Sequence, residues 1–169
     1  FADIANYTAI SEVLSASRLS LLFNTIFTRL TEIIFKHGGT LDKYIGDCVM
    51  SFFGAPKEMN DHSDRICLAA LEMIQALSDF PASSSFPGIS KISMRIGINT
   101  GFVSVGNMGS QHLFHYTVLG DPVNLASRLE GVNKLFKTSI LLSEFTVNQL
   151  KSPFALRKVG PVMVKGKTK

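Results

Sequence analysis

Cysteine is scarce in this sequence, and tryptophan is absent. The 169 residues include two cysteines, Cys48 and Cys67, and neither has a second cysteine or a histidine at metal-ligand spacing. We therefore expect no disulfide framework and no structural zinc site, and a reducing, cytoplasmic compartment is the expected location. The four histidines do not form a metal-binding group in the sequence either.

Long hydrophobic runs are also missing. The apolar segment between Arg18 and Arg29 has ten residues, and the uncharged stretch 96–120 is interrupted by glycines. A membrane-spanning helix needs roughly 20 consecutive apolar residues, so neither segment is predicted to cross a bilayer. No signal peptide or lipidation motif is present. These absences leave open whether another part of the parent protein is attached to a membrane.

Charged residues make up only 18% of the chain, against 46% hydrophobic residues, a balance that excludes intrinsic disorder. The net charge of +4 is spread along the sequence, which favours an anionic substrate and does not indicate nucleic-acid binding. The chain begins at Phe1 without methionine and ends at Lys169 without a closing hydrophobic strand. We expect residues 1–169 to form one domain of a longer protein.

Three common catalytic motifs are absent. No GxxxxGK[ST] phosphate loop occurs, and no GxGxxG is followed by an acidic residue at the dinucleotide-binding distance. A GxSxG nucleophile elbow is missing as well. A phosphate-loop, dinucleotide-binding or serine-hydrolase site is therefore not supported.

Hydrophobic periodicity predicts a mixed α+β order. Gly46-Asp47 separates two short apolar runs and indicates a hairpin, while Asp121-Pro122 indicates the N-cap and first residue of a helix. We predict a ferredoxin-like βαββαβ core with a mainly antiparallel sheet, helices packed on one face and C-terminal additions. The expected elements are a strand at 1–4, a helix through 19–34, a hairpin of 41–45 and 48–53, a helix from Asn60 or Asp61 to 77, a hairpin of 91–99 and 103–108, a helix from 121 to 132, and strands near 140 and at 155–164.

Two aspartates are the candidate metal ligands. Asp3 ends the first strand and Asp47 lies at the tip of the first hairpin, so neighbouring strands can bring both carboxylates to one edge of the sheet. Two carboxylates suit a pair of hard cations such as Mg²⁺ or Mn²⁺, which phosphoryl-type displacement uses. The alternative is an exposed strand end and an ordinary turn aspartate.

The predicted third helix carries a candidate phosphate clamp. Asn124 and Arg128 are four residues apart and share one face, so the guanidinium and the amide could clamp a phosphate and orient a ring oxygen. The alternative is a solvent-exposed helix on which Arg128 forms an ion pair with Glu130 or another neighbour. Lys165 and Lys167 likewise could be solvated charges near the end of the chain.

Several long motifs together resemble the catalytic domain of class III nucleotidyl cyclases, and the resemblance covers essentially the whole chain. They are FADI at 1–4 with YT at 7–8, GGTLDKYIGD at 38–47, RIGINTG at 95–101, YTVLGDPVNLASR at 116–128 and VKGK at 164–167. The resemblance implies that ATP or GTP is cyclised with loss of pyrophosphate, with two divalent cations, Mg²⁺ or Mn²⁺, as cofactors.

The resemblance also implies a role for individual residues. Asp3, Asp47 and the Ile4 carbonyl would hold metal, and Asn124 and Arg128 would stabilise the transition state. Lys43 and Thr117 match the base-recognition positions, where a lysine and a hydroxyl suit adenine; guanylyl members have glutamate and cysteine there. The phosphate-contacting residues would be Tyr7, Thr8, Arg95 and Lys165.

Threonine at position 117 is typical of a mainly bacterial adenylyl cyclase subclass, some members of which respond to bicarbonate. In the family, each site lies between two catalytic domains. Asp3, Asp47 and Arg95 would come from one domain, and Lys43, Thr117, Asn124, Arg128 and Lys165 from the other. Because this chain carries both sets, the expected assembly is a homodimer. The alternatives are a guanylate cyclase, an inactive dimerisation or nucleotide-sensing module, and, more distantly, a palm-type polymerase or dinucleotide cyclase.

Overall fold

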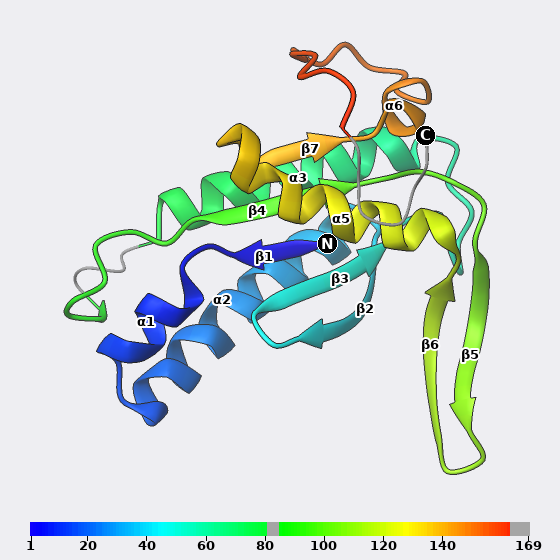
Figure 1. Cartoon of the computed structure of the whole chain (residues 1–169). Helices are drawn as coiled ribbons and strands as arrows, with labels where there is room; N and C mark the ends of the chain where they lie inside the picture. The colour runs from blue at the N-terminus through cyan, green and yellow to red at the C-terminus, as the bar shows by residue number, and fades with distance from the viewer. Residues whose placement is uncertain (81–84, 163–169) are drawn as a thin grey trace.

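The computed structural model describes residues 1–80 and 85–162 (Figure 1). Its helices and strands mostly follow the order predicted from the sequence, with two short helices, α1 and α6, and the strand β6 in addition. They are β1 (Ala2–Ile4), α1 (Tyr7–Val13), α2 (Ala16–Lys36), β2 (Thr40–Ile45), β3 (Cys48–Phe52), α3 (His62–Ser78), β4 (Met94–Ile98), β5 (Ser104–Ser110), β6 (Leu113–Leu119), α5 (Asp121–Phe136), β7 (Ile140–Leu142) and α6 (Glu144–Val147).

The main sheet has the strand order β2-β3-β1-β4-β7. β1 pairs antiparallel with both β3 and β4, and β7 joins β4 in parallel. The first four of these strands, with α2 and α3 between them, form the predicted ferredoxin-like βαββαβ core. β1 therefore lies inside the sheet, flanked by the two strands that contribute neighbours to Asp3.

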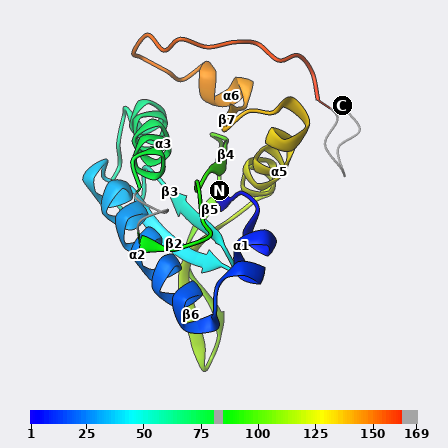
Figure 2. The same ribbon diagram turned by 90° about the vertical axis from the view of Figure 1, so that its left-hand side faces the viewer.

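The hydrophobic core lies between the sheet and the helices α2 and α3. Met94, Ile96 and Ile98 of β4 point into this core and are at most 4% exposed. Gly97 points to the opposite face, where it contacts the backbone of α5. Figure 2 shows α3 and α5 on opposite sides of the strands. The two core helices thus share one face, as predicted, whereas the third predicted helix, α5, lies against the other face.

The prediction of a hairpin between 91–99 and 103–108 is wrong. The strand at 94–98 does not pair with the segment after Gly101; instead β5 pairs with β6 over Ser104↔Leu119 to Ser110↔Leu113, in a separate two-stranded sheet. The long hairpin projects away from the core in Figure 1. The physical reason is competition for the open side of β4, which β7 occupies through parallel pairing of Ile96 with Ile140.

Other boundaries also differ from the predictions. Asp121 is the first residue of α5 and Gly120 is its N-cap, and the helix continues to Phe136 before Lys137 takes a left-handed conformation. Asp61 is the N-cap position of α3 but makes no side-chain capping bond. No strand forms at 155–162, and the rest of that predicted strand lies outside the described residues. Among the helices of the described ranges, none is long and apolar enough for a bilayer crossing.

Candidate active site

The two candidate metal ligands lie next to each other. Asp3 occupies the middle of β1, opposite Cys48 of β3 on one side and Arg95 of β4 on the other. Asp47 directly precedes Cys48 in the turn between β2 and β3, so strand pairing brings the two carboxyl groups together. The sequence prediction of this juxtaposition is confirmed, although β1 is an interior strand rather than a sheet edge.

The environment of Asp47 fits a cation-binding role. Partial burial, followed by the neighbouring Asp3 carboxylate, raises the pKa of Asp47 above its ordinary value, while a backbone hydrogen bond opposes this effect. Two carboxylates in mutual contact repel each other, and a bound divalent cation would remove that repulsion. Within the described ranges, no cluster of three or more His, Cys, Asp and Glu side chains forms a metal site. Further ligands at this pair would have to come from backbone, water or substrate.

The residues after Asp3 have different environments. The Ile4 side chain is buried in the core at 1% exposure, so only its backbone carbonyl is a candidate ligand. Tyr7 and Thr8 begin α1 and are exposed, and the Tyr7 ring packs edge-on against Phe23 with 5.2 Å between ring centroids. Their proximity in sequence to Asp3 is compatible with the predicted phosphate contact.

Arg95 connects the aspartate pair to α5. Its guanidinium forms an ion pair with Asp3, and its Nε donates a hydrogen bond of 2.9 Å to Glu130 on α5. The Arg95 side chain is 14% exposed, so this contact is shielded from solvent. The sequence suggested Glu130 as an ion-pair partner of Arg128, but in the structure Glu130 contacts Arg95. The predicted triphosphate contact of Arg95 would therefore compete with these carboxylates.

Helix α5 carries Asn124 and Arg128. Asn124 is exposed and Arg128 is partly exposed, but one Arg128 nitrogen, Nη1, is buried without a hydrogen-bond partner among the described residues. A buried guanidinium nitrogen without an acceptor is costly, and an incoming anionic ligand would satisfy it. The position of the helix depends on Gly97, whose Cα faces the Ala126 and Glu130 backbone.

Lys43 on β2 and Thr117 on β6 are close together, as expected for residues that read one base. The Lys43 Nζ lies 3.5 Å from the Thr117 Oγ1. Thr117 also donates a hydrogen bond to Asp42 Oδ2, and Lys43 forms a 3.1 Å ion pair with Asp42 Oδ1. Asp42 was not singled out in the sequence, because alternation along a regular strand places it on the face opposite Lys43.

The predicted residues thus form separate groups within one chain. Asp3, Asp47 and Arg95 form one group, Lys43 and Thr117 a second, and Asn124 with Arg128 a third on α5. Among the described residues, the hydrogen bonds that join Lys43 and Thr117 to each other and to Asp42 do not include Asp3 or Asp47. Lys165 lies outside the described residues.

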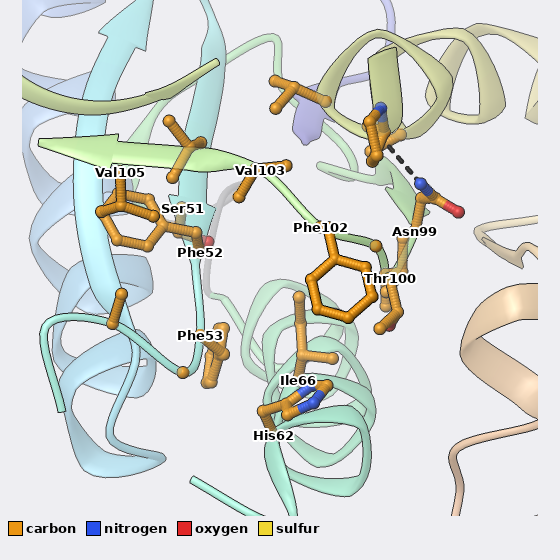
Figure 3. A pocket seen from close by; sticks show the side chains of 18 of the residues that line it. Ser51, Phe52, Phe53, His62, Ile66, Asn99, Thr100, Phe102, Val103 and Val105 are labelled. Atoms are coloured by element: carbon orange, nitrogen blue, oxygen red, sulfur yellow. Dashed lines mark hydrogen bonds between the residues drawn. The ribbon is translucent and has the colours of Figure 1, made fainter. Parts of the chain in front are cut away.

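A cavity of about 550 Å³ lies elsewhere, between the end of β3, the start of α3 and the loop after β4. Phe52, Phe53, His62, Ile66 and Phe102 are among its lining residues (Figure 3). None of the predicted site residues within the described ranges lines this cavity. The candidate site is therefore separate from this cavity.

The ferredoxin-like core, the paired carboxylates and the polar face of α5 are compatible with a metal-dependent enzyme that acts on a phosphate ester. The chain belongs to the adenylate and guanylate cyclase catalytic domain family, whose model matches residues 1–169. This membership confirms the resemblance found in the sequence.

Similar proteins include both kinds of cyclase. Adenylate cyclase 1 of Rhizobium meliloti is 34% identical over 99% of this chain, which spans 25% of that protein. The crystal structure of the adenylyl cyclase CyaB from P. aeruginosa has a TM-score of 0.90 and 35% identity, covering 99% of this chain and 86% of that one. The guanylate cyclase domain of RhGC from Catenaria anguillulae, in complex with GTP, has a TM-score of 0.84 and 31% identity, covering 98% and 87%.

Proposed function

We propose that this domain is an adenylate cyclase that converts ATP to 3′,5′-cyclic AMP and pyrophosphate at the interface of a homodimer. The observation that carries the proposal is the contact between Lys43 and Thr117 at 3.5 Å, at the positions where the family reads the base. The paired Asp3 and Asp47 carboxylates and the unpartnered Arg128 nitrogen support a catalytic rather than a purely structural role.

In the proposed reaction the ribose 3′ oxygen forms a bond to the α-phosphorus as the bond to the leaving pyrophosphate breaks and the 3′ hydroxyl loses its proton. Asp3 and Asp47 would hold two divalent cations, Mg²⁺ or Mn²⁺, which when bound lower the pKa of a coordinated hydroxyl and neutralise phosphate charge. Asn124 would orient the ribose, and Arg128 would meet the charge that develops on the α-phosphate. Tyr7, Thr8, Arg95 and Lys165 would contact the other phosphates.

The base-recognition pair favours ATP over GTP. The Lys43 ammonium has three donors and no acceptor, which suits the unprotonated N1 of adenine. Guanine presents N–H donors at N1 and the 2-amino group, so a lysine at this position leaves a donor facing donors. A similar cyclase domain in complex with GTP supports guanylate cyclase activity as the alternative. Lys43→Glu combined with Thr117→Cys should shift selectivity towards GTP.

The grouping of the residues supports the proposed homodimer. Asp3 and Arg95 lie on the paired strands β1 and β4, with Asp47 in the neighbouring turn between β2 and β3, whereas the exposed Asn124 and the partly exposed Arg128 lie on α5. A symmetric dimer would oppose the aspartates of one protomer to the α5 residues of its partner twice, which gives two equivalent sites.

The test is a mixture of two inactive variants, Asp47→Ala and Arg128→Ala, assayed for cyclic AMP with Mn²⁺ or Mg²⁺. In a homodimer of either variant, both sites lack one of the two residues. A mixed dimer has one site in which both residues are intact. Random exchange should therefore restore about a quarter of the wild-type rate. Subunit exchange is verified separately, by native mass spectrometry of the mixture of the two variants.

The alternative outcomes are distinct. If the mixture stays inactive although the subunits exchange, the aspartates and Arg128 act from the same protomer and the interface site is wrong. If the wild-type domain dimerises and binds ATP but cyclises neither ATP nor GTP, the dimerisation or nucleotide-sensing alternative holds. Cyclic GMP as the main product would identify a guanylate cyclase instead.

A further inference from the structure

Asp42 has an unusual position beside the base-recognition pair. Its side chain has no solvent exposure, and it contacts both Lys43 and Thr117. In a regular strand, neighbouring side chains point to opposite faces, so Asp42 and Lys43 could not both reach one residue on β6. The pairing of β2 with β3 shifts register between Leu41 and Lys43, so Asp42 has no paired residue on β3 in the strand ladder. This β-bulge turns both side chains towards Thr117.

The contacts fix the direction of the Thr117 hydrogen bond. A threonine hydroxyl has one hydrogen and two lone pairs, and it acts as donor or acceptor according to its neighbours. An ionised carboxylate can only accept, and here Asp42 Oδ2 accepts the Thr117 hydrogen while Oδ1 pairs with Lys43 at 3.1 Å. Because its hydrogen is committed to Asp42, the Thr117 oxygen can present only lone pairs to a ligand.

We propose that Asp42 is a positioning residue that makes Thr117 an obligatory hydrogen-bond acceptor, and that the site thereby selects 6-amino purine nucleotides over 6-oxo purine nucleotides. The 6-amino group of adenine donates to such an oxygen. The 6-oxo group of hypoxanthine or guanine is an acceptor and would face another acceptor. This inference deepens the proposed adenylate cyclase function and rests on it for the location of the base.

A structural role for Asp42 is the competing explanation. The carboxylate connects β2 to β6 and could serve only to hold the β5–β6 hairpin against the main sheet. Loss of such a contact would lower stability and turnover for every nucleotide alike. Loss of a purely structural contact would not change the preference between 6-amino and 6-oxo purines. This preference therefore distinguishes a structural role of Asp42 from a role in positioning Thr117.

The experiment compares ATP with inosine triphosphate, which has a 6-oxo group but lacks the 2-amino group of GTP. The value of kcat/KM for each nucleotide is measured in the wild-type chain, Asp42→Asn, Thr117→Val and the double variant. Asparagine keeps the size of aspartate but can donate through its amide, so the hydroxyl hydrogen of Thr117 becomes free to meet a 6-oxo group. We expect the ratio of ATP to inosine triphosphate to fall by about tenfold in Asp42→Asn, equivalent to one hydrogen bond.

Two controls complete the design. Thr117→Val removes the hydroxyl, so adding Asp42→Asn to it should change the ratio no further, whereas Thr117→Ser should keep the wild-type ratio. Asp79→Asn makes the same chemical change at an exposed carboxylate paired with Gln75 at the end of α3, and the ratio should not move. An unchanged ratio in Asp42→Asn, or a further change in the double variant, would overturn the inference.

Equilibrium binding of the same two nucleotides separates this inference from the proposed function. If the wild-type chain binds ATP more tightly than inosine triphosphate but cyclises neither, the proposed activity fails, and the binding ratio in Asp42→Asn still decides the role of Asp42. If the wild-type chain does not distinguish the two nucleotides, the proposed selection of 6-amino purines is wrong.

Discussion

Gly97 sets the distance between α5 and the sheet, and Gly97→Ala tests whether that distance matters for catalysis. A Cβ atom at position 97 would lie 2.2 Å from the Glu130 backbone nitrogen and 2.3 Å from the Ala126 carbonyl oxygen. Ordinary contact begins at 3.4 Å, so the helix would have to retreat by about 1.2 Å. Because both atoms belong to the backbone, no side-chain rotation can relieve the clash.

The displacement should affect both stability and turnover. Overpacking of this kind costs about 1–3 kcal/mol in the free energy of unfolding. Misplacement of catalytic groups by about 1 Å can cost on the order of 100-fold in rate. Since Asn124 and Arg128 move with α5 and are proposed to act in the transition state, kcat should fall by that order while the KM for ATP changes little.

The assay is steady-state cyclic AMP production together with urea unfolding. Gly131→Ala, on α5 itself, is the matched control, because nothing lies within 4 Å of its added Cβ. It should keep full activity and gain up to about 1 kcal/mol from the higher helix propensity of alanine. Wild-type turnover in Gly97→Ala would refute the reasoning that the close approach of α5 positions the catalytic residues.

Three further predictions concern the buried polar groups and the cysteines. Asn133→Ala should cost about 1–3 kcal/mol in the free energy of unfolding, because it removes the hydrogen bonds that the fully buried Asn133 amide donates to the Ile96 carbonyl of β4 and accepts from the Thr138 hydroxyl; a loss below the error of the urea unfolding fit would contradict this. The Ser152 hydroxyl, then the backbone N–H groups of residues 151–152, hold the pKa of Asp64 below its ordinary value of 3.8. The wild-type protein should therefore have a larger free energy of unfolding than Asp64→Asn. This difference should be complete above pH 3.8 and should shrink as the pH falls through the lowered pKa of Asp64. Unfolding curves in an acid pH series measure the difference, and a difference independent of pH would argue against the prediction. Burial raises the pKa of Cys48 and of Cys67 to about 11, so both thiols should resist alkylation by iodoacetamide at neutral pH until urea unfolds the domain. Mass spectrometry measures the alkylation, and rapid labelling of the folded protein would contradict the prediction.

Most of the core elements could be predicted from the sequence because their signals are local. The apolar positions of α2 recur at helical spacing, and Gly46, with a positive φ, begins the turn that the Gly46-Asp47 pair predicted. The juxtaposition of Asp3 and Asp47 was predictable as well, since it requires only the hairpin and its pairing with β1. Asn124 and Arg128 share a helix face for the same local reason.

The sequence by itself thus determined the fold class, the aspartate pair and the motifs of the cyclase family. The tertiary structure alone decided the partner of β4, because β5 and β7 compete for strand pairing through contacts distant in sequence. It also decided that Arg95 contacts Glu130 and that a bulge turns Asp42 towards Thr117. Periodicity assigns a side chain to a face of its own element, but the opposing group and any shift of register depend on how the elements pack.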